Sequence, residues 1–257
     1  MDLQLRGKTA FVAASTGGLG RATAEALAHE GANVVITGRR RETAEQIAAA
    51  LPSAIGLELD VLDAASRTRA LEQARDAFGL IDILVLNGPG PKPGTAADMT
   101  ADGARTAFEQ LVEPHRQLVS ETLPGMRERG WGRILAVGSS GIVSPLPNLA
   151  ASNLGRAALA NYLKTLSTEV AADGVTVNLL LPGRIATDRV ANLDAAQAER
   201  QGLSRQEVEQ RSQQSIPAGR YGEPAEFGAA AAFLCSGPAS YVTGVALRCD
   251  GGLVGTL

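Results

Sequence analysis

Short apolar runs alternate with longer amphipathic segments along almost the whole chain. Seven apolar runs have the length of strands and occupy residues 8–14, 33–37, 55–59, 81–86, 133–137, 175–181 and 245–249. Apolar positions recur at helical spacing in residues 22–30, 41–51, 64–78, 101–129, 149–172 and 223–234. The strands are apolar throughout rather than alternating, which is typical of a sheet that helices cover on both faces.

This alternation of strand and helix predicts the fold class and the domain organisation. We expect an α/β protein with a Rossmann-like, doubly wound parallel sheet of about seven strands flanked by helices. The crossovers between its strands should be right-handed. Neither an internal repeat nor a linker divides the sequence, so residues 1–257 are expected to form a single domain.

Two segments interrupt the pattern. Pro114 lies inside the predicted helix of residues 101–129 and should bend or break it, because proline has no amide hydrogen to donate. Residues 187–219 follow the sixth strand and are polar, rich in Gln, Glu and Arg. Ligands bind at the carboxyl ends of such sheets, so this insertion is a candidate substrate lid. A pair of surface helices is the alternative interpretation.

Composition and charge narrow the possible partners. Charged residues make up 20% of the chain and the formal net charge is -3, so nucleic acid is not expected as a partner. No apolar stretch approaches the roughly 20 residues of a membrane span, and the first residues lack the apolar core of a signal peptide. Cys235 and Cys249 lie far apart without metal-ligand spacing. We therefore expect a reduced, cytoplasmic protein with no metal site.

A glycine-rich turn between the first strand and the first helix is a candidate nucleotide site. It comprises Ala14, Ser15, Thr16, Gly17, Gly18, Leu19 and Gly20. Glycines here let the backbone approach a pyrophosphate, which also receives the amide groups and the positive dipole of the helix N-terminus. A tight connection from strand to helix is the alternative reason for the same small residues.

The end of the second strand bears on the choice of nucleotide. Sites that bind NAD usually carry an acid there, which accepts hydrogen bonds from the ribose hydroxyls. This chain has Gly38 followed by Arg39, so the acid is missing and a guanidinium is available for a 2′-phosphate. We therefore expect NADP(H) to be favoured over NAD(H). A solvated start of the next helix is the alternative role of Arg39.

Together with further motifs, the turn resembles the short-chain dehydrogenase/reductase family over nearly the whole chain. The turn is close to the family's T-G-x-x-x-G-x-G pattern, with Ala13-Ala14 in place of Thr-Gly. The other matches are Asp60 after strand three, Asn87-Gly88 after strand four, Ser139 after strand five, Pro182-Gly183 and Thr187 after strand six, Tyr241 to Gly244, and Asp250 to Gly252. The resemblance implies a single dinucleotide-binding domain.

The resemblance also implies further cofactor contacts. Asp60, followed by Val61, matches the family position that contacts the adenine amino group. Asn87, followed by Gly88, matches the position that supports the central strand and lines the adenosine side. The remaining cofactor-binding residues implied by the resemblance are Arg156, Pro182, Gly183 and Thr187.

The catalytic positions depart from the family pattern. Most members use a Tyr as proton donor, a Lys four residues later, a Ser that orients the carbonyl, and an Asn from the long helix before strand five. The matching positions here are Ser152, Arg156, Ser139 and Leu111, and no Tyr-x-x-x-Lys sequence occurs anywhere in the chain. A serine hydroxyl is a far weaker acid than a tyrosine, and arginine stays protonated. Ser139, Ser152 and Arg156 are the candidate catalytic residues, and i, i+4 spacing places the last two on one helix face.

Residues 151–156, Ala-Ser-Asn-Leu-Gly-Arg, resemble an atypical 3-oxoacyl-[acyl-carrier-protein] reductase-like subgroup without the Tyr and Lys pair. This implies an NADP(H)-dependent oxidoreductase for a small-molecule or acyl carbonyl or its alcohol. The alternatives are a catalytically silent nucleotide-binding sensor or partner subunit and, less favoured, a halohydrin dehalogenase. The family's packing of long helices implies a homotetramer. His29 is expected at a helix end, and His115 is expected to pack or to point toward the site or a partner subunit.

Overall fold

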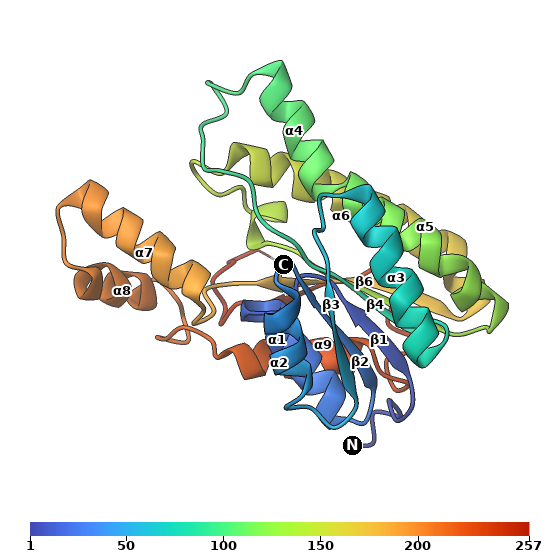
Figure 1. The fold of residues 1–257 in the computed structure, drawn as a ribbon. Coiled ribbons are helices and arrows are strands. Elements are labelled where there is room, and N and C mark those ends of the chain that lie inside the picture. The colour runs from blue at the N-terminus through green and yellow to red at the C-terminus, as the bar shows by residue number, and fades with distance from the viewer. Residues whose placement is uncertain (257) are drawn as a thin grey trace.

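The computed structural model describes residues 1–256, which fold around one parallel sheet (Figure 1). Its strands are β1 (Thr9–Val12), β2 (Asn33–Gly38), β3 (Ala54–Glu58), β4 (Ile83–Leu86), β5 (Gly132–Val137), β6 (Val175–Pro182) and β7 (Ala246–Cys249). Within the described residues the sheet has seven strands in the order β3-β2-β1-β4-β5-β6-β7, and all pairs are parallel. The predicted fold class is confirmed.

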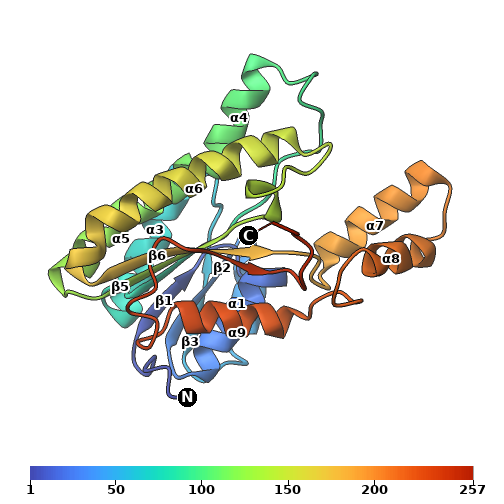
Figure 2. The same cartoon turned by 180° about the vertical axis from the view of Figure 1, so that it is seen from behind.

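Helices cover both faces of this sheet (Figures 1 and 2). They are α1 (Gly18–His29), α2 (Arg41–Ala48), α3 (Ala64–Phe78), α4 (Ala101–Leu111), α5 (Glu113–Glu128), α6 (Ala150–Val170), α7 (Asp188–Gln201), α8 (Arg205–Gln214) and α9 (Pro224–Leu234). Phe11 of β1 packs in one core cluster with Leu71 of α3 and Leu163 of α6. The next residue, Val12, packs in the opposite cluster with Leu27 of α1 and Phe227 of α9.

The order of the strands reverses at β1, which pairs with β2 on one side and with β4 on the other. In open parallel sheets this reversal opens a crevice at the carboxyl ends of the strands, where ligands bind. The glycine-rich turn follows β1 and Asn87 follows β4, so both border this crevice.

The helix predicted over residues 101–129 is two helices, α4 and α5, which are separated at Val112. Pro114 accounts for the break, because it has no amide hydrogen to donate to the preceding turn and is best tolerated in the first turn of a new helix. The expectation that this proline interrupts the helix is confirmed.

Residues 187–219 contain the helix pair α7 and α8, which projects from the carboxyl edge of the sheet in both views (Figures 1 and 2). In the described part of the chain, none of the helices combines the length and apolarity that a membrane crossing requires.

Candidate active site

The backbone of the turn after β1 is strained and is held by two neighbouring strands. Ala14 has a φ of 49°, in the left-handed region that is costly for a residue with a Cβ. Its amide donates to Thr37 Oγ1 at 3.0 Å, and its carbonyl accepts from Asn87 Nδ2 at 3.0 Å. A Cβ at Gly20 would lie 2.6 Å from that carbonyl oxygen and 2.6 Å from Asn87 Nδ2, so only glycine fits there.

Above the turn there is open space. A Cβ at Gly17 would meet nothing within 4 Å, and one at Gly18 would meet Thr187 Cγ2 at 3.9 Å. α1 begins at Gly18 without a side-chain cap, so its first amide groups remain available to a ligand. Leu19 packs its side chain against the core below. The backbone of the turn therefore fits the pyrophosphate of a dinucleotide.

Ser15 and Thr16 support the turn from beneath. Ser15 is fully buried, and its hydroxyl donates to the Val12 carbonyl and accepts from the Thr37 amide. The side chain of Thr16 lies so close to Gly38 that a Cβ on this glycine would be 2.5 Å from Thr16 Cγ2. Any side chain at this position would therefore require Thr16 to move, which favours the glycine.

Arg39, the basic residue predicted to meet a cofactor phosphate, lies at the surface. It is exposed and directly follows Gly38 at the carboxyl end of the strand. Arg41 is engaged instead with Glu45 on its own helix, at 2.7 Å. Among residues 1–256, no carboxylate lies within ion-pair distance of Arg39.

The predicted adenine contacts lie just after β3 and β4. Asp60 Oδ1 accepts from the Leu62 amide at 2.9 Å, and the Asp60 amide donates to Ser66 Oγ at 3.0 Å. These bonds fix the carboxylate at the end of the strand. Val61 is buried, and its Cγ1 lies 3.6 Å from where a Cβ of Gly88 would be. Asp60, Val61 and Gly88 are thus brought to the same side of the crevice.

His115 is buried behind Gly88. Its Nδ1 hydrogen-bonds the Leu111 carbonyl at 2.8 Å, next to the helix break that Pro114 causes. Its Nε2 has no partner among the described residues and lies 3.6 Å from where a Cβ of Gly88 would be. Burial, with a smaller effect of the Arg156 charge, lowers the pKa of His115 to about 4. It is therefore neutral at pH 7, in keeping with the expectation that it packs.

Ser152 and Arg156 meet on one face of α6. Ser152 is buried, and its Oγ accepts from Arg156 Nε at 3.3 Å. Arg156 NH1 also donates to the Val137 carbonyl at 2.9 Å and to the Gly138 carbonyl at 3.3 Å. Burial lowers the pKa of Arg156 to about 10, so the guanidinium remains protonated at neutral pH.

Ser139 follows those two carbonyls at the end of β5. Its Oγ accepts from the Gly141 amide at 3.0 Å, which leaves the hydroxyl hydrogen free to donate to a ligand. Asn153 of α6 holds the loop beyond it, because its Nδ2 donates to the Leu146 carbonyl at 2.9 Å. The three candidate catalytic residues are therefore gathered around the carboxyl end of β5.

A proton donor of the usual kind does not reach this place. Leu111, at the family's Asn position, is buried, and its Cδ1 lies 2.7 Å from where a Cβ of Gly155 would be. Tyr162 is half-buried further along α6, and Tyr241 is fully exposed. Tyr221 donates to Asp194 of α7. None of these three tyrosines is hydrogen-bonded to Ser139, Ser152 or Arg156.

The end of β6 leads directly to the α7–α8 insertion. Pro182 ends the strand, and the Gly183 amide donates to the Cys249 carbonyl at 3.0 Å. A Cβ on Gly183 would lie 2.6 Å from the Asp250 Cα, so this crossing requires glycine. Thr187 then caps α7, and its Cγ2 lies 3.9 Å from where a Cβ of Gly18 would be.

A buried carboxylate attaches the insertion to the body of the protein. Asp194 of α7 is 2% exposed. It accepts from Arg184 NH1 through one oxygen and from Tyr221 Oη through the other, the latter at 2.8 Å. These contacts fix α7 to segments on both sides of it in the sequence. Asp194 was not among the residues predicted from the sequence.

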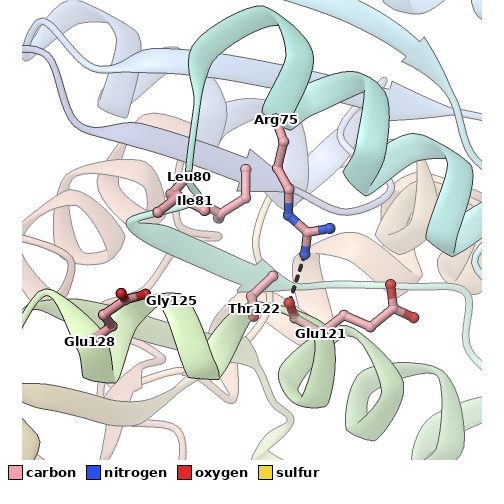
Figure 3. Close-up of a pocket in the computed structure, with 7 residues that line it drawn as sticks. All are labelled: Arg75, Leu80, Ile81, Glu121, Thr122, Gly125 and Glu128. Carbon is pink, nitrogen blue, oxygen red and sulfur yellow. Dashed lines mark hydrogen bonds between the residues drawn. The ribbon is translucent and has the colours of Figure 1, made fainter.

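Two hollows occur near these elements. One of about 320 Å³ lies between the loop after β4 and the start of α6, and is lined by Gly94, Thr95, Asp98, Met99, Thr100, Gly103 and Ala151. A second of about 320 Å³ lies between α3 and α5, at the amino end of β4, with Arg75, Glu121 and Glu128 among its lining residues (Figure 3). Only the first lies on the side of the candidate catalytic residues. No cluster of three His, Cys, Asp or Glu side chains suited to a metal occurs within residues 1–256.

Comparisons with known proteins agree with this geometry. The family model described as enoyl-(acyl carrier protein) reductase matches residues 13–254. The 3-oxoacyl-[acyl-carrier-protein] reductase of Haemophilus influenzae is 36% identical over 252 residues, which cover 97% of this chain and 99% of that protein. The corresponding enzyme of Escherichia coli is 34% identical, with coverage of 98% and 99%.

Solved structures give the same result. L-sorbose reductase from Gluconobacter frateurii, complexed with NADPH and L-sorbose, matches with a TM-score of 0.93, 31% identity and complete coverage of both chains. YwfH, an NADPH-dependent reductase involved in bacilysin biosynthesis, matches with a TM-score of 0.92 and 29% identity, covering 97% of this chain and 99% of its own. Fold and relatives together define an oxidoreductase. The chain belongs to the short-chain dehydrogenase/reductase family.

Proposed function

We propose that this chain is an NADP(H)-dependent oxidoreductase that reduces a small-molecule or 3-oxoacyl-like carbonyl, or oxidises the corresponding alcohol. The observation that carries the proposal is the set of contacts made by Arg156. It bonds Ser152 and also the backbone just before Ser139, at the carboxyl end of β5. The names of the relatives, which are reductases of 3-oxoacyl groups or of L-sorbose, support this class of substrate.

The preference for NADP(H) rests on the end of β2. Gly38 stands where an NAD site usually has an acid, any side chain there would press against Thr16, and the exposed Arg39 follows it. A guanidinium at this point would pair with a 2′-phosphate through two parallel hydrogen bonds. Asp60, Asn87 and the open turn would hold the rest of the dinucleotide. Two of the structures that match this chain belong to NADPH-dependent or NADPH-bound reductases.

A nicotinamide cofactor, when bound at the glycine-rich turn, would supply or accept the hydride. Ser139 and Ser152 donate hydrogen bonds to the carbonyl oxygen of the substrate, and Arg156 orients Ser152 and stabilises negative charge on that oxygen. Neither serine is acidic enough to act as the proton donor, and Arg156 remains protonated. The proton therefore comes from water or from the substrate. General acid catalysis typically contributes about 10²–10⁴ in rate, so a slow enzyme is expected.

We infer from this chemistry an atypical subgroup without the Tyr and Lys pair, and the burial of Leu111 at the Asn position supports the inference. The contacts of Arg156 with the carbonyls of Val137 and Gly138 also favour a second candidate function. A protein whose Arg156 serves mainly to tie α6 to the carbonyls of β5 would bind nucleotide without turnover, as a sensor or a partner subunit.

The organisation of the molecule completes the proposal. Residues 1–257 act as one dinucleotide-binding domain, with residues 187–219 as the lid over its substrate. The exposed Phe108 of α4 and Leu154 of α6 give these long helices an apolar face for assembly into a homotetramer. Cys235 and Cys249 are free thiols, which suits the cytoplasm.

NADPH consumption tests the enzymatic proposal. Absorbance of NADPH is followed with a panel of ketones, sugars and acetoacetyl thioesters, for the unmodified protein and for Ser152→Ala. We expect turnover with one class of compound, reduced about a hundredfold in the variant, with the Kd for NADPH retained. Binding of NADPH without consumption by any compound would favour the sensor instead.

A further inference from the structure

Arg189 in the first turn of α7 reaches back over the crevice to the loop after β4. A Cβ on Gly90 would lie 2.5 Å from Arg189 NH2 and 2.6 Å from NH1, so the guanidinium rests against the bare backbone of this glycine. Among residues 1–256, no carboxylate lies within 4 Å of Arg189. The side chain thus bridges the insertion and the opposite wall without an ion-pair partner.

Arg156 is a second arginine near the crevice that has no acidic partner among the described residues. Its recorded hydrogen bonds go to Ser152 and to two backbone carbonyls, and none goes to an acid. Burial lowers the pKa of Arg156, and the nearby charge of Arg189 lowers it further. Two cations that repel each other in a partly buried site are unfavourable unless an anion joins them. Other arginines near the insertion, Arg184 and Arg220, do have acidic partners.

The position of Arg189 favours an anion on the substrate over the phosphates of the cofactor. The pyrophosphate belongs at the start of α1, where Thr187 lies near Gly18. Arg189 lies instead against Gly90, on the β4 side. In the strand order, β4 separates β1 from β5, which leads to Ser139. Arg189 therefore lies between the glycine-rich turn and the candidate catalytic residues.

We propose that Arg189, together with Arg156, binds an acidic group of the substrate, so that the preferred substrates are small oxo acids or hydroxy acids. This inference rests on the proposed function and narrows its substrate class. A guanidinium presents a planar pair of donors that suits a carboxylate. Because Arg189 belongs to α7, its contact with a bound anion would also draw the insertion toward the substrate. A neutral thioester would gain nothing from this pair.

The test compares an acid with its ester at equal size. Acetoacetate and methyl acetoacetate are titrated by calorimetry, with and without saturating NADP+, against the unmodified protein, Arg189→Ala and Arg189→Lys. Arg200→Ala, an exposed arginine of the same helix, is the control. The Kd for NADPH is measured for every variant.

We expect the unmodified protein to bind acetoacetate at least about tenfold more tightly than the ester. Arg189→Ala should abolish this difference and leave the Kd for NADPH nearly unchanged, Arg189→Lys should keep part of it, and Arg200→Ala all of it. Equal or undetectable binding of acid and ester would overturn the inference. The inference would also be overturned if Arg189→Ala lost NADPH binding but kept the preference for the acid. Arg189 would then bind a phosphate of the cofactor and not the carboxylate of the substrate. Failure of any NADPH binding would refute the proposed function alone, since the comparison without nucleotide still reports the anion site.

Discussion

Asn87 Nδ2 donates to the Ala14 carbonyl at 3.0 Å and thereby joins the ends of β4 and β1 across the point where the strand order reverses. This bond holds Ala14 in a left-handed conformation that alanine ordinarily avoids. The glycine-rich turn therefore carries backbone strain, and a side chain that follows the neighbouring strand stabilises it.

Relief of this strain is the first prediction. A left-handed alanine costs about 1–2 kcal/mol of strain in the folded state, which glycine would relieve. Glycine also gives the unfolded chain more conformational entropy, and this offsets part of the gain. Ala14→Gly should therefore stabilise the protein by roughly 1 kcal/mol. Chemical denaturation measures the change. Ala13→Gly is the matched control, since Ala13 is buried with no positive φ, and it should destabilise by a similar amount. Equal effects of the two substitutions would contradict the account.

Loss of the bond itself is the second prediction. Asn87→Ala leaves the Ala14 carbonyl without its donor, which should cost about 1–3 kcal/mol of stability and weaken NADPH binding about tenfold or more. Asn33→Ala removes a comparable side-chain bond, to Ser53, at the amino end of β2. We expect that control to lower stability and leave the Kd for NADPH unchanged. Unaltered NADPH binding in Asn87→Ala would show that the turn does not depend on this bond.

Attachment of the α7–α8 insertion gives the third prediction. Asp194→Ala leaves Arg184 and Tyr221 without their acceptor. Because Arg184 is 30% exposed, solvent weakens its ion pair with Asp194, and we expect the substitution to destabilise the attachment by about 2 kcal/mol. That loss raises the fraction of molecules with a detached insertion roughly 30-fold. Trypsin should then cleave within α7 and α8 at least about tenfold faster. Glu199→Ala, an exposed carboxylate on α7, should leave the rate unchanged. An unaltered rate in Asp194→Ala would contradict the anchoring role.

The fourth prediction concerns pH. Burial lowers the pKa of His115 to about 4 from an ordinary value of 6.5. Between these values the unfolded chain binds a proton that the folded chain does not, so stability falls as the pH drops from 6.5 toward 4. The loss between pH 6.5 and 5 should be roughly 2 kcal/mol at this one site. His115→Gln should have a correspondingly flatter dependence in urea unfolding. The same pH dependence in both proteins would show that His115 is not buried as a neutral group.

Much of this architecture can be predicted from the sequence, because local patterns dictate it. Apolar runs define all seven strands, and Pro114 marks the break between α4 and α5. The i, i+4 spacing of Ser152 and Arg156 places them in contact. These features depend on residues close together in the chain.

The features that escaped prediction depend on residues far apart in the chain. The contact of Thr16 with Gly38 and that of Arg189 with Gly90 follow from the packing of loops from different strands. The burial of Ser15 beneath the turn likewise could not be read from a glycine-rich motif. Arg189 had only one signal in the sequence, a basic residue two positions after Thr187 at the start of the insertion.

A nucleotide titration tests the central claim, that the turn after β1 and Arg39 bind NADP(H). The Kd values of NADPH and NADH are measured by nicotinamide fluorescence for the unmodified protein and for Arg39→Ala, with Arg41→Ala as control because Glu45 already engages Arg41. We expect NADPH to bind at least about tenfold more tightly than NADH, and Arg39→Ala alone to remove this preference. Binding of neither nucleotide by the unmodified protein would contradict the account.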